Sequence, residues 1–191
     1  MPLPPFDARG LMPPFLGTDA RTPDRSPYFV GIVEFAGALG TTAHRRQLLR
    51  NLIAYRALLA QDDYLSGIQF IDGSFVENVE LTASRPPGDI DVFSLLNAPA
   101  KYLSNPPSWA ASGLPFWQDE IIHRDKNKSR FSLDTYALLF EELRPDSLIN
   151  GVIYWYSLFS HQRATLAWKG FVALALDPLG DNAALTALGS A

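Results

Sequence analysis

The sequence contains no cysteine. Disulfide bonds, thiolate nucleophiles and zinc sites with cysteine ligands are therefore excluded. It also lacks an apolar run near the roughly 18 residues that a membrane-spanning helix needs. The proline-rich start has neither the basic stretch nor the apolar core of a signal peptide. We therefore expect a soluble cytoplasmic protein with no membrane association.

Positive charge is also in short supply. The 191 residues include 16 Lys and Arg against 20 Asp and Glu, for a net charge of −4. This balance argues against a broad DNA-binding surface but leaves room for a local basic patch. Hydrophobic residues make up 47% of the chain, enough to form a folded core, and the length suggests one domain.

Proline is concentrated at the start of the chain, at positions 2, 4, 5, 13, 14, 23 and 27. This density excludes a regular helix or a central strand. Interleaved hydrophobic residues such as Phe6 and Leu11 favour an extended arm on the domain surface, and a disordered tail is the alternative. We expect an arm over 1–27, a single domain over 28–180 and a tail of small residues over 181–191.

Periodicity predicts an α+β fold with a small mixed sheet flanked by helices. Residues 28–39 fit either a strand or a short helix. A helix over 42–60, capped by Thr41 or Thr42, would turn its leucines inward and most of its arginines elsewhere. The other expected elements are strands at 67–71, 89–96, 119–124, 130–140 and 168–176, a short helix after Gly73-Ser74, a loop at 82–88, largely irregular chain at 97–119, a hairpin tip at RDKNK, and a helix from Pro145 or Asn150 to about Gln162 with Val152, Ile153, Tyr156 and Phe159 inward.

Two carboxylates interrupt an apolar strand pattern in FIDGSFVENVELTASRPPGDIDVFSLL, residues 70–96. Alternation directs Asp89 and Asp91 to one face, with Cα atoms about 7 Å apart. Two carboxylates at this separation repel each other, and a divalent cation removes the conflict. Hard oxygen ligands suit Mg²⁺, and a pair of such ions can clamp a phosphoryl displacement. Alone, the pair could simply solvate a strand end.

Gly73 and Ser74 precede these carboxylates at a turn out of a strand. Glycine lets the backbone approach a phosphate, and the first turn of a following helix offers free N–H groups. An ordinary turn with Ser74 as helix cap is the simpler interpretation of the pair alone. The two motifs together, in this order, favour a phosphate and metal site.

Asp134 is a third carboxylate, alone in an apolar strand pattern. A buried carboxylate needs a partner. The candidates are a metal shared with Asp89 and Asp91, which we favour, or a nearby cation; those cations are Arg124, Lys126, Lys128 and Arg130. Lys169 is a further candidate: it could donate to a nucleotide triphosphate, or it could be a strand lysine whose ammonium reaches solvent.

Gly73-Ser74, then Asp89-Ile90-Asp91, then Asp134 together resemble the signature of the DNA polymerase β-like nucleotidyltransferase superfamily. DGSFVENVE, RPPGDIDV and YWYSLFSHQRATLAWKGF are also similar to a group of small bacterial proteins classed as nucleotidyltransferase-like. The connection from Ser74 to Asp89 is longer than the spacing usual in the superfamily.

The resemblance implies that Asp89, Asp91 and Asp134 bind two Mg²⁺ ions, while Gly73 and Ser74 bind the phosphates of a nucleoside triphosphate; Lys169 remains a candidate nucleotide-binding residue on its own residue type and position. It implies a nucleotidyltransferase whose acceptor is a hydroxyl of a protein, an RNA or a small molecule, in a toxin–antitoxin or phage-defence setting. The alternative is an inactive nucleotidyltransferase fold that acts through a protein partner.

Overall fold

A five-stranded mixed sheet forms the centre of the computed structural model, which describes residues 2–142 and 144–189. The first residue of the expected arm and the last two of the expected tail lie outside this range. The strand order is β1-β5-β2-β3-β4. The β1–β5 and β3–β4 pairs are parallel, and β2 is antiparallel to both β5 and β3. The strands are β1 (Tyr28–Val30), β2 (Gly67–Asp72), β3 (Ile90–Leu96), β4 (Leu133–Leu139) and β5 (Val172–Ala175).

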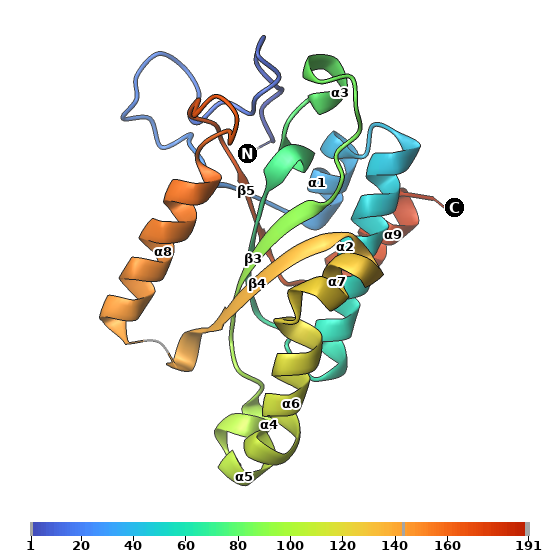
Figure 1. Ribbon diagram of the computed structural model, residues 1–191, viewed down its shortest axis with the longest axis vertical. Helices are drawn as coiled ribbons and strands as arrows, with labels where there is room; N and C mark the ends of the chain where they lie inside the picture. The colour runs from blue at the N-terminus through green and yellow to red at the C-terminus, as the bar shows by residue number, and fades with distance from the viewer. Residues whose placement is uncertain (1, 143, 190–191) are drawn as a thin grey trace.

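Helices lie on both sides of this sheet, which confirms the predicted α+β class (Figure 1). One side carries α1, α2, α7 and α9, and the other carries α8. The helices are α1 (Ile32–Leu39), α2 (Ala43–Gln61), α3 (Val79–Thr82), α4 (Ala100–Leu103), α5 (Pro106–Ser108), α6 (Leu114–Phe116), α7 (Arg124–Phe131), α8 (Pro145–Phe159) and α9 (Pro178–Ala187). Four further short helical turns are labelled η. Two are 3-10 turns, η1 (Gly73–Val76) and η4 (Phe140–Glu142), and two are π turns, η2 (Trp109–Gly113) and η3 (Trp117–Ile121).

Alternation along the strands divides the side chains between two layers. Ile71, Val92 and Leu133 are fully buried in the main core, with the leucines of α2. Residues of the opposite phase form a second, smaller cluster against α8; its members are Phe70, Phe93, Tyr136, Leu138, Trp155, Phe159 and Phe171. The face with α8 is the less covered one, and it is the face that carries the candidate site.

The predicted helix at 42–60 is confirmed as α2. Thr42 is its cap, because the Thr42 hydroxyl accepts a hydrogen bond from the Arg45 amide at 3.1 Å. The prediction that its arginines lie mostly off the buried face is wrong for Arg45 and Arg56, which are almost fully buried. Both guanidinium groups find carboxylate and carbonyl acceptors inside the protein, and this offsets the cost of burying them.

The chain between β3 and β4 differs most from expectation. The segment 97–119, expected to be largely irregular, instead contains most of a series of short helical turns that runs over 100–121. The strand expected at 119–124 is absent from the described chain, and RDKNK begins α7 rather than a hairpin tip. The fully buried Asn127 explains this helix, because its amide donates at 3.0 Å to the carbonyls of Glu120 and Ile121 at the preceding turn. A short polar sequence is thus anchored as a helix by a contact outside itself.

Both interpretations of residues 28–39 are partly correct, since β1 is followed directly by α1. The predicted helix from Pro145 is confirmed, but three of its expected inward residues are exposed, and Phe159 alone of the four is buried. The exposed three are Val152, Ile153 and Tyr156. The expected tail begins inside α9, which packs on α1 and α2. No helix in the described chain is long and apolar enough to cross a bilayer.

Candidate functional site

Three aspartates lie side by side across three neighbouring strands. The strand register pairs Asp72 of β2 with Asp91 of β3, and Asp91 with Asp134 of β4. They share the face that carries α8, because Phe70, Phe93 and Tyr136 are two residues away in the same strands. We call these three residues the aspartate row. Asp89 precedes Asp91 by two residues, so the structure brings together all three predicted metal ligands.

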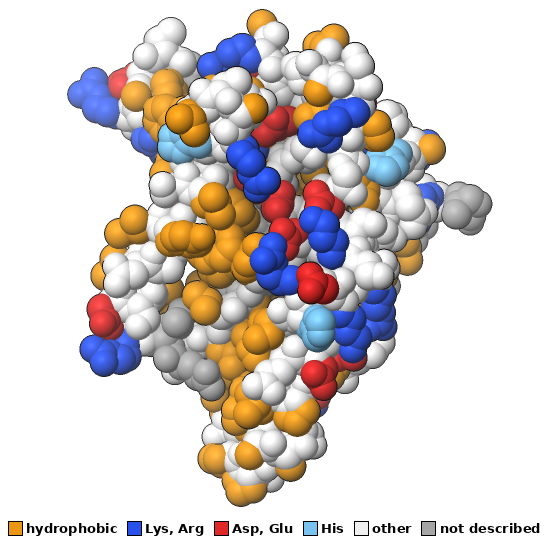
Figure 2. All heavy atoms as spheres, in the orientation of Figure 1, with side chains coloured by type: hydrophobic (Ala, Val, Ile, Leu, Met, Phe, Trp, Pro, Cys, Tyr) orange, Lys and Arg blue, Asp and Glu red, His pale blue; other side chains and the backbone are white. Residues whose placement is uncertain are grey.

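Figure 2 shows acidic and basic side chains gathered at the centre of this face, next to a hydrophobic patch. Asp91 is the member of this charged cluster without compensation: within the described residues its carboxylate has no hydrogen bond or ion pair. Burial, together with the negative charges of Asp89 and Asp134, raises the pKa of Asp91 to about 6 against the opposing effects of Arg163 and Lys169. An additional positive charge at the site would therefore stabilise the ionised Asp91 carboxylate.

Gly73 lies directly against this carboxylate. Its φ of +76° suits glycine, and a Cβ at this position would overlap Asp91 Oδ2. The absence of a side chain at Gly73 therefore lets the Asp91 carboxylate lie directly against the backbone of the turn. The short helix expected after Ser74 is instead the four-residue 3-10 turn η1, followed by α3.

Lys169 lies behind this turn and is only 2% exposed. Its ammonium contacts the Asp72 carboxylate at 3.0 Å, the Glu77 carboxylate at 2.7 Å and the Gly73 carbonyl at 3.3 Å. The ammonium donates hydrogen bonds to Glu77 and Gly73, and its contact with Asp72 is an ion pair. Lys169 therefore fixes the Gly73 turn from within, rather than presenting a free cation to a ligand.

Asp72 and Glu77 are the members of this network that sequence reasoning missed. Burial raises the pKa of Asp72 to about 7, against the opposing charge of Lys169. Gln162 joins the network by donating to Glu77 at 2.8 Å. Asp72 had a detectable signal, because alternation in FID gives it the phase of Phe70. The role of Glu77 depends on a tertiary contact that leaves no pattern in the sequence.

The other two predicted metal ligands have cationic partners on α7. The guanidinium of Arg124 binds both oxygens of Asp134, with Nε and Nη2 at 2.7 and 2.8 Å. The ammonium of Lys128 lies 2.8 Å from Asp89 Oδ2. Arg124, one of the cations expected as an alternative partner of Asp134, is thus in contact with it, and a metal shared with Asp89 and Asp91 stays a prediction.

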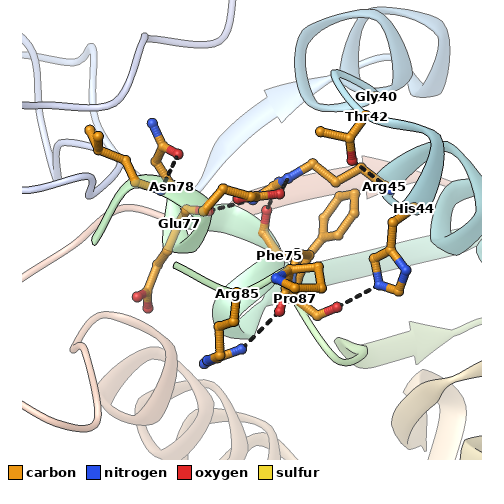
Figure 3. Close-up of polar contacts among 12 residues, drawn as sticks. Gly40, Thr42, His44, Arg45, Phe75, Glu77, Asn78, Arg85 and Pro87 are labelled. Carbon is orange, nitrogen blue, oxygen red and sulfur yellow. Dashed lines mark hydrogen bonds and ion pairs between the residues drawn. The ribbon is translucent and has the colours of Figure 1, made fainter. Parts of the chain in front are cut away.

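The long connection from Ser74 to Asp89 is fixed to the start of α2 (Figure 3). Arg45 reaches into it from α2, and its acceptors are the carbonyls of Phe75 (2.7 Å) and Glu77 (2.6 Å) and the carboxylate of Glu80 (2.6 Å). His44 Nε2 lies 2.7 Å from the Pro87 carbonyl. The extra length is thus an ordered segment that holds both ends of the site in place.

An aromatic cavity of about 230 Å³ adjoins the aspartate row. It lies beyond Asp134 along β4, between α8 and the start of α7. Trp155 stacks on Phe93 with ring centroids 4.6 Å apart, and the Arg124 guanidinium lies 4.5 Å from the Tyr136 ring centroid. The cavity can take a flat apolar group within reach of Asp134.

The donor set fits magnesium in chemistry and in charge. Three carboxylates supply the hard oxygen ligands that Mg²⁺ prefers, and among the described residues Asp91 has no hydrogen-bond or ion-pair partner. In the part of the chain that the structure describes, no three acidic, His or Cys side chains are already arranged around one ion position. Asp89 and Asp134 face Lys128 and Arg124 instead. A metal would therefore have to displace these two cations.

These features define an α+β protein with a carboxylate-rich site on one sheet face. The chain belongs to the DUF6932 family, a family of unknown function whose model matches residues 4–175. No curated protein and no solved structure matches the chain. Proposals about its chemistry therefore depend on the site and on the motif resemblance.

Proposed function

We propose that the protein is a Mg²⁺-dependent nucleotidyltransferase of the DNA polymerase β-like type. The observation that carries this proposal is the register of β3 and β4, which sets Asp91 beside Asp134 and brings Asp89 to the same face. Gly73, whose missing side chain lets the Asp91 carboxylate lie against the turn, supports it further. The aspartates and the glycine that carry the motif resemblance are distant in sequence and lie close together in the fold.

In the proposed reaction an acceptor hydroxyl attacks the α-phosphorus of a nucleoside triphosphate, and pyrophosphate leaves. Asp89, Asp91 and Asp134 would hold two Mg²⁺ ions, which supply positive charge to the phosphates. Gly73 and Ser74 would bind the β- and γ-phosphates from the turn. Asp134 is next in the chain to Thr135, which lines the aromatic cavity, and is the candidate to accept the proton of the hydroxyl. Lys169 would position the turn.

Calorimetric titration of ATP, GTP, CTP and UTP, with and without Mg²⁺, tests the proposal on the wild type and on Asp89→Ala/Asp91→Ala. We expect at least one nucleotide to bind in a way that needs both the metal and the aspartates. If no nucleotide binds in this way, the proposal that the protein is a nucleotidyltransferase is refuted. Labelled nucleotide added to cell extract would then identify a protein, RNA or small-molecule acceptor.

Binding without transfer would favour the alternative, an inactive fold that works through a protein partner. The paired states of Asp89 and Asp134 are the observation in its favour, because a site that has lost its metal would be expected to keep such counter-ions. Transfer to any acceptor excludes this alternative. A toxin–antitoxin or phage-defence setting is compatible with both.

A further inference from the structure

Two cations of α7 stand at the carboxylates that the proposed metal site needs. Arg124 and Lys128 are four residues apart, so they project from the same side of this helix. One covers both oxygens of Asp134, and the other contacts Asp89. The remaining two cations of α7, Lys126 and Arg130, instead pair with Glu120 away from the aspartate row. The charges of α7 are thus divided between the site and a structural contact.

The two pairs at the site are accessible to competition. The side chains of Arg124 and Lys128 are 51% and 57% exposed, whereas those of their partners Asp134 and Asp89 are 13% and 25% exposed. Each cation can therefore move out into solvent while its carboxylate stays in place. This distinguishes them from the buried Lys169 pair, whose rupture would leave charges stranded. A divalent ion at Asp89, Asp91 and Asp134 can therefore replace these contacts without disrupting the core.

We propose that Arg124 and Lys128 are the counter-ions of the resting site, displaced when a divalent metal binds, and that they then bind substrate phosphates. The inference rests on the proposed function. One Mg²⁺ carries the same charge as the two side chains that it replaces, so the net charge of the cluster does not change. The freed guanidinium and ammonium are then available to phosphate oxygens, which both groups bind well.

Calorimetric titration of Mg²⁺ alone tests the first half of the proposal. The variant Arg124→Gln/Lys128→Gln should bind the ion about tenfold more tightly than the wild type, because two competing charges are gone. The control Lys126→Gln/Arg130→Gln changes the same net charge on the same helix and should bind as the wild type does. A double variant that binds Mg²⁺ no more tightly than the control would overturn the inference.

Inorganic triphosphate in saturating Mg²⁺ tests the second half. Here the same variant should bind several-fold more weakly than the control, because the phosphate ligands are missing. Opposite changes in the two titrations cannot arise from simple structural damage, which would weaken both. Unchanged triphosphate affinity would overturn the assignment of these residues to the substrate.

The Asp89→Ala/Asp91→Ala background separates this inference from the proposed function. Suppose that Mg²⁺ binding requires the aspartates but is not strengthened by loss of Arg124 and Lys128. This result would contradict the counter-ion inference and leave the proposed function standing. Mg²⁺ binding that is seen only in the Arg124→Gln/Lys128→Gln variant supports the counter-ion inference. If neither the wild type nor the variant binds Mg²⁺, both proposals fail.

Discussion

Burial and repulsion from neighbouring carboxylates act together on Asp91 and raise its pKa to about 6. The stability of the protein should therefore depend measurably on pH. A folded-state pKa above the unfolded value of 3.8 means that the native protein holds this proton more tightly. The resulting stabilisation is present below about pH 4 and is lost as the pH rises through about 6. At pH 8 the native state therefore bears the cost of an uncompensated charge.

Asp91→Asn should remove this cost. In EDTA, we expect the variant to gain about 2 kcal/mol in the free energy of unfolding, relative to the wild type, between pH 4 and pH 8. Urea denaturation at the two pH values measures it. The exposed Asp119→Asn serves as control and should show no comparable gain. A pH-independent difference for Asp91→Asn would contradict the role assigned to Asp91.

Gly73 allows a second test at the residue scale. Gly73→Ala places a methyl group on Asp91 Oδ2 and also strains a positive φ, whereas Gly17→Ala, at φ +82°, meets nothing within 4 Å. Strain alone should cost about 1–2 kcal/mol in either variant. The overlap with Asp91 should make Gly73→Ala worse and weaken its Mg²⁺ binding. Equal losses of stability in the two variants, with intact metal affinity, would show that the close contact of Asp91 with the Gly73 backbone is not needed.

At the scale of elements, α9 is attached to α2 through a buried ion pair. Arg56 Nε contacts Asp181 Oδ1 at 2.7 Å, and burial raises the pKa of Asp181 while lowering that of Arg56. Each charge therefore depends on the other for compensation. Asp181→Asn should destabilise the protein by about 3 kcal/mol in thermal or urea unfolding. The exposed Asn182→Ala on the same helix should cost less than about 0.5 kcal/mol; similar values for both would refute the anchoring role.

Strong periodicity predicted the elements that depend on their own residues. The amphipathic pattern of α2 and the apolar runs of β2, β3 and β5 were sufficient for this reason. By contrast, α7 contains mostly polar residues and is a helix because Asn127 and Phe131 contact other elements. The strand order was also beyond the sequence, because pairing of β5 with β1 and β2 joins segments far apart in the chain.

The candidate site was more predictable than the sheet that holds it. Local patterns identify its residues: strand alternation pairs Asp89 with Asp91, and turn chemistry singles out Gly73. Asp134 is recognisable as a lone carboxylate among apolar residues. The cations were harder to place. The polar run RDKNK predicts a hairpin tip, so its pattern does not indicate the helix that carries Arg124 and Lys128. The burial of Lys169 between Asp72 and Glu77 depends on tertiary packing, which no local pattern in the sequence indicates.

At the scale of the whole molecule, the proline-rich arm is part of the fold. Met12 is fully buried in the main core, and its carbonyl accepts from the Gly170 amide at 2.7 Å, next to Lys169. We expect Met12→Ala to cost about 3 kcal/mol. Arg21→Ala, in an exposed part of the same arm, should be close to neutral. Thermal unfolding compares them, and a neutral Met12→Ala would show that the arm is dispensable.

The aspartate row also makes insertions and deletions an informative class of change. A shift of β4 by one residue against β3 would turn Asp134 into the main core and bring Leu133 or Thr135 to the site. Added residues in the helical turns over 100–121 leave this phase intact, because those turns lie outside the sheet. Across the family, chain length should therefore vary in that segment and stay constant through β3 and β4, even where individual side chains differ.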